Sequence, residues 1–142
     1  ILIHEGSDDH SIAKAVVDAV GEVPIITEPD PLYIKGILGE CEGTIGSRFH
    51  GLVSALSQGV PALATGWSHK YEMLFKDYEF DEGILNIQDL DDAREKIDMI
   101  LDLDYSEAIR AKLKAQSESL KAQSEKMWNE VFSLIDERCR SR

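Results

Sequence analysis

The sequence has little cysteine and no long apolar run. Its two cysteines, Cys41 and Cys139, are far apart, and neither belongs to a CxxC pair. This argues against a disulfide framework or a zinc site and favours reduced thiols in a cytoplasmic protein. No uninterrupted apolar stretch approaches the roughly 20 residues that a transmembrane helix needs. We therefore expect a soluble cytoplasmic protein with no integral membrane segment.

Basic residues are also scarce. The 142 residues include 15 Lys and Arg against 27 Asp and Glu, so the formal net charge is −12. A field of that sign repels nucleic acid, and we expect no nucleic-acid partner. An anionic ligand would have to be held by a local cluster of donors.

The start of the chain lacks an initiator Met, a basic leader and a small-residue cleavage site. Because Ile1-Leu2-Ile3 is apolar from its first residue, we expect a strand there and infer that the sequence is a fragment. A length of 142 residues with 43% apolar content is ordinary for one globular domain. Residues 1–142 are therefore predicted to form a single carboxy-terminal domain of a longer protein.

Short apolar runs alternate with amphipathic segments along the chain. This pattern predicts an α/β fold in which helices cover a parallel sheet. Strands are predicted near residues 1–4, 23–27, 43–46, 61–65 and 84–87. Helices are predicted near 9–20 and 32–41, then through Leu52, Val53 and Leu56 to a stop at Gly59, and near 70–77, 89–101 and, as one helix or two, 106–138. The apolar end of the last segment needs cover from its own domain or from a partner domain, and could also let the chain self-associate.

Local signals support the first two helices. Asp8, Asp9 and Ser11 offer amino-terminal caps, and Gly21 is placed to end the first helix. Pro29 and Pro31 restrict the backbone before the second. The cluster of Asp8, Asp9 and His10 has the spacing of a helix start, so we predict no metal site.

Ligands of open parallel sheets bind beyond the carboxyl ends of the strands. Three polar loops are predicted to follow the carboxyl ends of the strands, and the loop of residues 46–51 is the most informative of them. Gly46 and Ser47 form a turn in which Ser47 can cap the next helix, and Arg48 and His50 fall in the first helical turn, where cations oppose the helix dipole. That placement is favourable if an anion shares the site. Alternatively, Arg48 pairs with a surface carboxylate and His50 is a structural residue.

Residues 45–61, IGSRFHGLVSALSQGVP, and residues 66–71, GWSHKY, resemble the carboxy-terminal signature of the polysaccharide pyruvyl transferase family, which includes colanic-acid and exopolysaccharide biosynthesis proteins. The detailed likeness spans about residues 32–71, and a looser one begins at His4. The resemblance implies a Rossmann-like domain with helices on both faces of the sheet. This domain would be one half of a GT-B-like enzyme whose active site lies between the two halves.

The family transfers the enolpyruvyl group of phosphoenolpyruvate to a sugar of a cell-surface polysaccharide or its precursor. The resemblance therefore implies a donor-binding domain with phosphoenolpyruvate as donor substrate and no cofactor. The partners are a saccharide acceptor and an amino-terminal domain outside this chain. Because half of the cleft would be missing, we expect negligible turnover from these residues alone.

Carried over to this sequence, the resemblance assigns Arg48 and His50 to the donor site as catalytic residues. His50 would protonate the methylene carbon or the leaving phosphate, or would only bind the donor. Lys70 matches a basic residue of the family, although a solvated lysine is the alternative. The other substrate-binding candidates are Gly46, Ser47, Phe49, Ser68, Trp67, His4 and Glu5. Trp67 could equally be a lid or core side chain.

Two other functions stay open at this point. A GT-B glycosyltransferase that uses a nucleotide sugar would also bind pyrophosphate at a helix terminus. A sugar-binding or anion-binding module could keep the fold without turnover. Phosphoenolpyruvate and a uridine nucleotide would distinguish the two enzymes as ligands.

Overall fold

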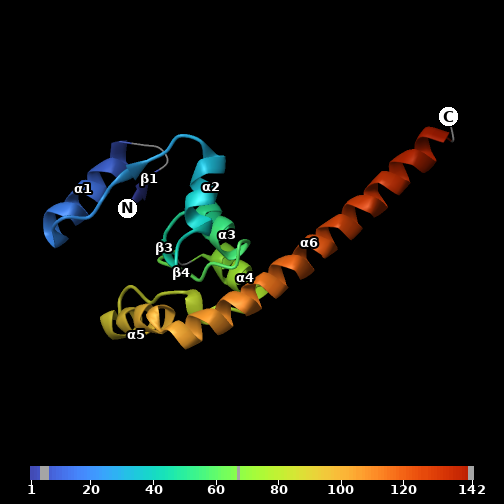
Figure 1. Cartoon of the computed structure of the whole chain (residues 1–142). Helices are drawn as coiled ribbons and strands as arrows, with labels where there is room; N and C mark the ends of the chain where they lie inside the picture. The colour runs from blue at the N-terminus through green and yellow to red at the C-terminus, as the bar shows by residue number, and fades with distance from the viewer. Residues whose placement is uncertain (4–6, 67, 141–142) are drawn as a thin grey trace. The chain divides into compact units, whose positions relative to one another are not determined.

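The structure is a computed structural model that describes residues 1–3, 7–66 and 68–140. The chain divides into two compact units, Ile1–Cys41 and Glu42–Arg142. Figure 1 labels most of their elements. In each unit, a helix connects two parallel strands. This confirms the α/β class predicted from the sequence. Among the described residues the strands form two separate two-stranded sheets.

Unit 1 contains β1 (Leu2–Ile3), α1 (Ser7–Val20), β2 (Ile26–Thr27) and α2 (Pro31–Gly39). The strands pair in parallel, with Leu2 opposite Ile26. The apolar residues of α1 have helical spacing, but Ile12 and Val20 are 64% and 65% exposed. Among the described apolar side chains of this unit, only those of Ile3 and Ala13 are buried. Unit 1 therefore has a very small core.

Helix boundaries in unit 1 follow local chemistry. Gly21, at φ +95°, ends α1 as predicted, because glycine tolerates the left-handed region. Asp8 and Asp9 lie inside the first turn of α1 rather than before it, since the helix already begins at Ser7. At the start of α2 the Asp30 side chain accepts a hydrogen bond from the Leu32 N–H at 2.8 Å, with Pro31 in the first turn.

Unit 2 is built on β3 (Thr44–Gly46) and β4 (Ala62–Ala64), connected through α3 (Phe49–Leu56). The strands pair in parallel, with Thr44 opposite Ala62 and Gly46 opposite Ala64. All three residues of β4 are buried, as expected for the inside of a parallel sheet. Both strands therefore end at the same edge, where the loop into α3 and the loop after β4 begin.

After β4 come α4 (His69–Asp77), a 3-10 turn η1 (Asp81–Gly83) and α5 (Leu90–Leu101). The strand expected over 84–87 is reduced to one bridge between Ile84 and Ala64. Pairing stops because the chain turns at Asn86, whose N–H donates to the Asp92 carboxylate on α5 at 2.9 Å. The largest fully buried side chains among the described residues all belong to unit 2: Leu52, Leu56, Val60, Pro61, Leu63, Phe75, Phe80 and Leu113.

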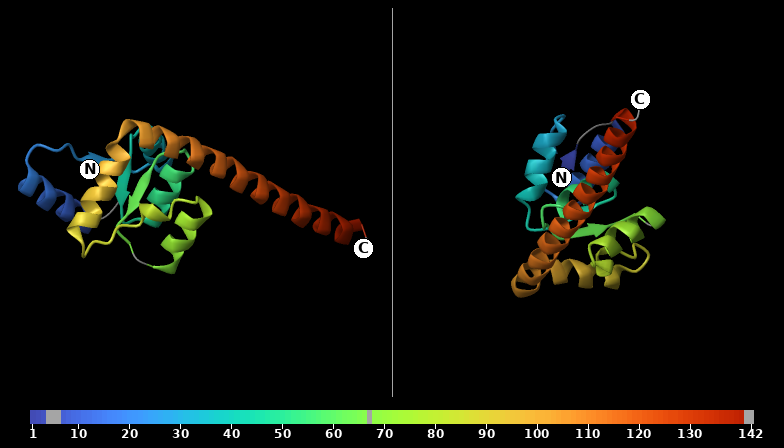
Figure 2. Two further views of the ribbon diagram at one scale, coloured as in Figure 1. Left: turned by 90° about the horizontal axis from the view of Figure 1, so that it is seen from below. Right: turned by 90° about the vertical axis from the view of Figure 1, so that its right-hand side faces the viewer.

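The tail of the chain is a single helix, α6 (Leu103–Arg140). Its first half packs on unit 2 through Ile109 and Leu113, and the Ser117 hydroxyl donates to the Ser57 carbonyl at 2.8 Å. Past Ser117 no described residue of α6 is buried. Figure 2 shows the helix continuing well beyond these contacts. Across the described parts of the chain, no helix is both long and apolar enough to span a membrane.

Candidate functional site

The loop after β3 leads directly into the amino-terminal end of α3. Arg48 occupies the N-cap position, and no described side chain caps this end of the helix. The prediction that Ser47 caps α3 is therefore wrong, because the helix begins one residue later than that role requires. The N–H groups of the first turn of a helix have no partner within the helix. In α3 these N–H groups can therefore donate hydrogen bonds to an acceptor other than a capping side chain.

The two basic residues of this loop that were predicted to bind an anion lie on the surface. Arg48 and His50 are both exposed, at the N-cap and in the first turn of α3. A Cβ placed on Gly51 would meet no heavy atom within 4 Å, so there is open space beside this turn. At Gly46 the nearest side-chain atom to such a Cβ would be Leu52 Cδ2 at 3.9 Å. Packing therefore does not demand glycine at residue 46.

Phe49 connects this loop with α4. Its ring lies edge-on to the rings of His50, at 5.9 Å between centroids, and of Tyr71, at 5.8 Å. The Lys70 ammonium lies 5.3 Å from the Phe49 ring centroid and 5.2 Å from that of Tyr71. The structure thus brings together Phe49, His50 and Lys70, three residues that the sequence analysis proposed from two separate loops.

Tyr71 contacts both Phe49 and Lys70. Its side chain is buried, with 8% exposed, and its hydroxyl donates a 2.7 Å hydrogen bond to the Ser47 carbonyl. Tyr71 is the last residue of the segment GWSHKY, and the sequence pattern alone indicates no role for it. A tyrosine among polar residues at a helix start was the available signal, but its partner lies 24 residues away in the sequence.

The start of α4 is the second helix terminus at this edge. Ser68 is its N-cap residue, exposed and without a side-chain capping bond. Its carbonyl accepts the Tyr71 N–H at 2.8 Å. His69 lies next to the Glu72 carboxylate, with 3.6 Å between Nδ1 and Oε2. That neighbour makes His69 a weaker candidate for binding an anion than Lys70, which is also exposed.

Three predicted site residues, His4, Glu5 and Trp67, lie outside the described residues. Their roles stay predictions. Among the residues that are described, no group of three or more His, Cys, Asp or Glu side chains could hold a metal ion.

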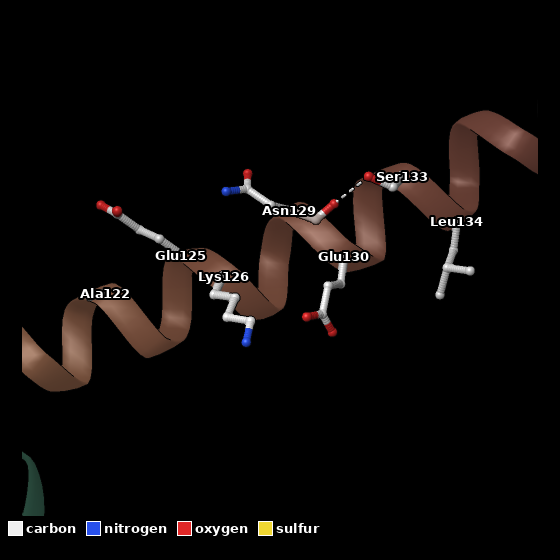
Figure 3. A pocket seen from close by; sticks show the side chains of 7 residues that line it. All are labelled: Ala122, Glu125, Lys126, Asn129, Glu130, Ser133 and Leu134. Atoms are coloured by element: carbon white, nitrogen blue, oxygen red, sulfur yellow. Dashed lines mark hydrogen bonds between the residues drawn. The ribbon is translucent and has the colours of Figure 1, made fainter.

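A shallow hollow lies elsewhere, along the distal part of α6. Its lining residues are Ala122, Glu125, Lys126, Asn129, Glu130, Ser133 and Leu134. All seven belong to one helix, and Figure 3 shows their side chains pointing to more than one side of it. A ligand pocket is normally enclosed by several elements. This hollow therefore belongs to the surface of an exposed helix and does not compete with the edge of the β3–β4 sheet as a functional site.

The fold and this edge together define an α/β protein with cationic side chains where two parallel strands end. The model of the polysaccharide pyruvyl transferase family matches residues 2–69. The match spans the described part of unit 1 and continues in unit 2 through β3, α3, β4 and the first residue of α4. It confirms the transferase family recognised from the sequence over that part of the chain.

Within the family match lie Gly46, Ser47, Arg48, Phe49, His50 and Ser68. Lys70 and Tyr71 come just after it. No curated protein matches the chain, and no solved structure does. The likeness to the family therefore rests on the model match over residues 2–69 alone, and the geometry described above is the basis for proposing roles for individual residues.

Proposed function

We propose that this chain is the donor-binding domain of a pyruvyl transferase. The enzyme would move the enolpyruvyl group of phosphoenolpyruvate onto a sugar of a cell-surface polysaccharide or its precursor. One observation carries the proposal: within the segment matched by the family, α3 begins without a capping side chain from the described residues and bears Arg48 and His50 at that end. Such an arrangement suits a dianionic or trianionic ligand.

Arg48 has the chemistry to orient the donor. A guanidinium forks onto a carboxylate or a phosphate through two parallel hydrogen bonds, and phosphoenolpyruvate carries both groups. The first N–H groups of α3 would donate hydrogen bonds to the other oxygens. Lys70, fixed beside Phe49, would add a second positive charge at the phosphate. In a chain with a net charge of −12, such local cations are needed to attract an anion.

The reaction assigned to this site forms a ketal. Two acceptor hydroxyl oxygens bond to C2 of the donor, and the bond from C2 to the phosphate oxygen breaks. One of the two hydroxyl protons ends on the methylene carbon, which becomes a methyl group, and the other on the released phosphate. His50 would pass one of these protons, and the cations would stabilise the charge on the departing phosphate. The step requires no cofactor.

The remaining candidates complete the proposed donor site. Gly46 and Ser47 would let the donor approach the backbone, Phe49 and Ser68 would line the site, and His4, Glu5 and Trp67 would contribute from the neighbouring loops. The fold proposed is Rossmann-like, and the saccharide acceptor would be held by the other half of a GT-B-like arrangement. We place the enzyme in the cytoplasm.

Self-association through α6 is a further part of the proposal. The distal part of α6 exposes a set of large apolar side chains: Met127, Trp128, Phe132, Leu134 and Ile135. Residues 121–140 contain four basic and four acidic residues, so this segment is neutral in a strongly acidic chain. Two copies could therefore bring these segments together with little charge repulsion.

The proposal is tested by identifying the donor. Phosphoenolpyruvate and a uridine diphosphate sugar are titrated separately into the chain by calorimetry. Saturable binding of phosphoenolpyruvate and no saturation by the nucleotide sugar is expected. Saturation by the nucleotide sugar alone would instead indicate a glycosyltransferase domain, and saturation by neither would remove the donor site proposed here.

A further inference from the structure

The Tyr71 side chain links the two helix starts of unit 2. Its hydroxyl donates to the Ser47 carbonyl at 2.7 Å, and its own N–H donates to the Ser68 carbonyl at 2.8 Å. The side chain is 8% exposed, and the bond from its hydroxyl is partly buried. A buried hydroxyl that lost its acceptor would carry a desolvation cost, which favours keeping the bond. Tyr71 therefore ties the loop after β3 to α4.

The Tyr71 ring has little room to move. A Cβ on Gly66 would come within 2.7 Å of the ring atom Cζ, so the backbone of the loop after β4 lies directly against the ring. The Phe49 ring contacts it in a T-shaped arrangement at 5.8 Å. Displacing the ring would disturb Phe49 or the loop at Gly66, and the hydroxyl position is correspondingly well defined.

The bond to Ser47 has a direct consequence for Arg48. The Ser47 carbonyl and the Arg48 N–H belong to one planar peptide unit, so holding the carbonyl fixes the orientation of that plane. The orientation of Arg48 relative to this plane is given by its φ, which is −91° at the N-cap position. Lys70 precedes Tyr71 in the same helical turn, and its ammonium lies 5.2 Å from the Tyr71 ring.

We propose that Tyr71 is a positioning residue for the donor site. It fixes the Ser47–Arg48 peptide and the first turn of α4 relative to each other, and so presents Arg48 and Lys70 to one ligand. It does not act on the donor itself, because its side chain is buried and its hydroxyl is engaged by the Ser47 carbonyl. The inference rests on the proposed function for the identity of the ligand, but not for the geometry of the loop.

Tyr71→Phe is the test variant, because it removes the hydroxyl and keeps the ring. Tyr78→Phe is the matched control: Tyr78 is also buried in unit 2, with 6% exposed, and lies at the other end of α4. Phosphoenolpyruvate binding to the 142-residue chain is measured for both. Tyr71→Phe is expected to raise Kd about three- to tenfold, the effect of one lost hydrogen bond, while Tyr78→Phe leaves Kd within about twofold. Equal changes in the two variants would overturn the proposal.

A ligand-free measurement separates this inference from the proposed function. Backbone amide chemical shifts of residues 47–50 are compared in the unliganded wild type and both variants. Large shifts in Tyr71→Phe and none in Tyr78→Phe are expected, whether or not phosphoenolpyruvate binds. Unchanged shifts at Arg48 in Tyr71→Phe would refute the positioning role. If phosphoenolpyruvate fails to bind the wild type while these shifts appear, the proposed donor fails and the positioning role stands.

A second variant covers the case in which Tyr71→Phe does not fold. Gly66→Ala keeps the hydroxyl but presses a methyl group against the Tyr71 ring. Gly36→Ala, in α2 where an added Cβ meets nothing within 4 Å, is its control. Gly66→Ala is expected to shift the amide signals of residues 47–50 and Gly36→Ala is not. No shift at these residues in folded Gly66→Ala would contradict the proposal.

Discussion

The ammonium of Lys70 lies 5.3 Å from the centroid of the Phe49 ring. Lys70 belongs to the first turn of α4 and Phe49 is the first residue of α3, so this contact joins two helix starts that follow neighbouring parallel strands. An exposed cation over an aromatic ring stabilises a protein by about 0.5–1 kcal/mol. The contact holds a positive charge close to the proposed donor site without neutralising it.

A double-mutant cycle measures this contact. Lys70→Met and Phe49→Leu, alone and combined, are each expected to lower the free energy of unfolding, with a coupling of about 0.5–1 kcal/mol between them. Urea titrations of the four proteins supply the values. Lys76→Met, a lysine in the last turn of the same helix, is the control for loss of charge and should show no coupling with Phe49→Leu. Additive effects of Lys70→Met and Phe49→Leu would show that the contact does not stabilise the site.

His50→Gln tests the proton-transfer role of His50 in the complete enzyme. Loss of a general acid lowers kcat by about 10²- to 10⁴-fold with little change in the donor KM, because the interaction acts in the transition state. Steady-state kinetics with varied phosphoenolpyruvate separate the two constants. His69→Gln, which alters the neighbouring exposed histidine paired with Glu72, should change neither. A raised KM with unchanged kcat in His50→Gln would show that His50 binds the donor and does not transfer a proton.

Alkaline pH should destabilise unit 2 through Tyr78. Burial raises the pKa of its phenol above the ordinary value of 10.0. The folded state then keeps a proton that the unfolded state loses, so stability is present below pH 10.0 and falls as the pH rises above it. Urea midpoints measured between about pH 8 and pH 11 should decline less steeply in Tyr78→Phe than in the wild type. Tyr33→Phe, at a side chain 68% exposed, should follow the wild type; identical slopes in all three would argue against a buried phenol.

The apolar face of α6 should drive concentration-dependent association. Replacing Trp128 and Phe132, whose side chains are 51% and 58% exposed, with Glu is expected to keep the chain monomeric at concentrations where the wild type forms dimers. Light scattering over a range of protein concentrations reports the mass. Asn129→Glu with Ser133→Glu adds the same charge to α6 through exposed polar residues and should leave association intact. A wild type that stays monomeric throughout would refute self-association.

Local signals in the sequence were sufficient for most of the secondary structure. The helical spacing of apolar residues, the prolines before α2 and the glycine after α1 act within a few residues, and the helices form close to where these signals place them. The last predicted strand is only the bridge at Ile84 in the structure. The turn at Asn86 and its hydrogen bond to Asp92 of α5 end the pairing, and neither follows from the apolar pattern of the strand.

Less of the candidate site could be predicted from the sequence. Arg48, His50 and Lys70 stand out as cations at helix starts, a local pattern. The bond from Tyr71 to the Ser47 carbonyl spans 24 residues and involves a backbone atom, which no side-chain pattern reveals. Local patterns also do not fix the first residue of α3. The helix begins at Phe49, which leaves Arg48 and not Ser47 at the N-cap position.

The central claim is that the cations at the start of α3 bind phosphoenolpyruvate. It is tested most directly by calorimetric titration of phosphoenolpyruvate into the wild type, Arg48→Ala and Arg94→Ala, the last removing an exposed arginine of α5. Loss of charge-assisted hydrogen bonds predicts an increase in Kd of about 10- to 100-fold for Arg48→Ala, and a change within about twofold for Arg94→Ala. An Arg48→Ala protein that binds phosphoenolpyruvate as tightly as the wild type would contradict the account.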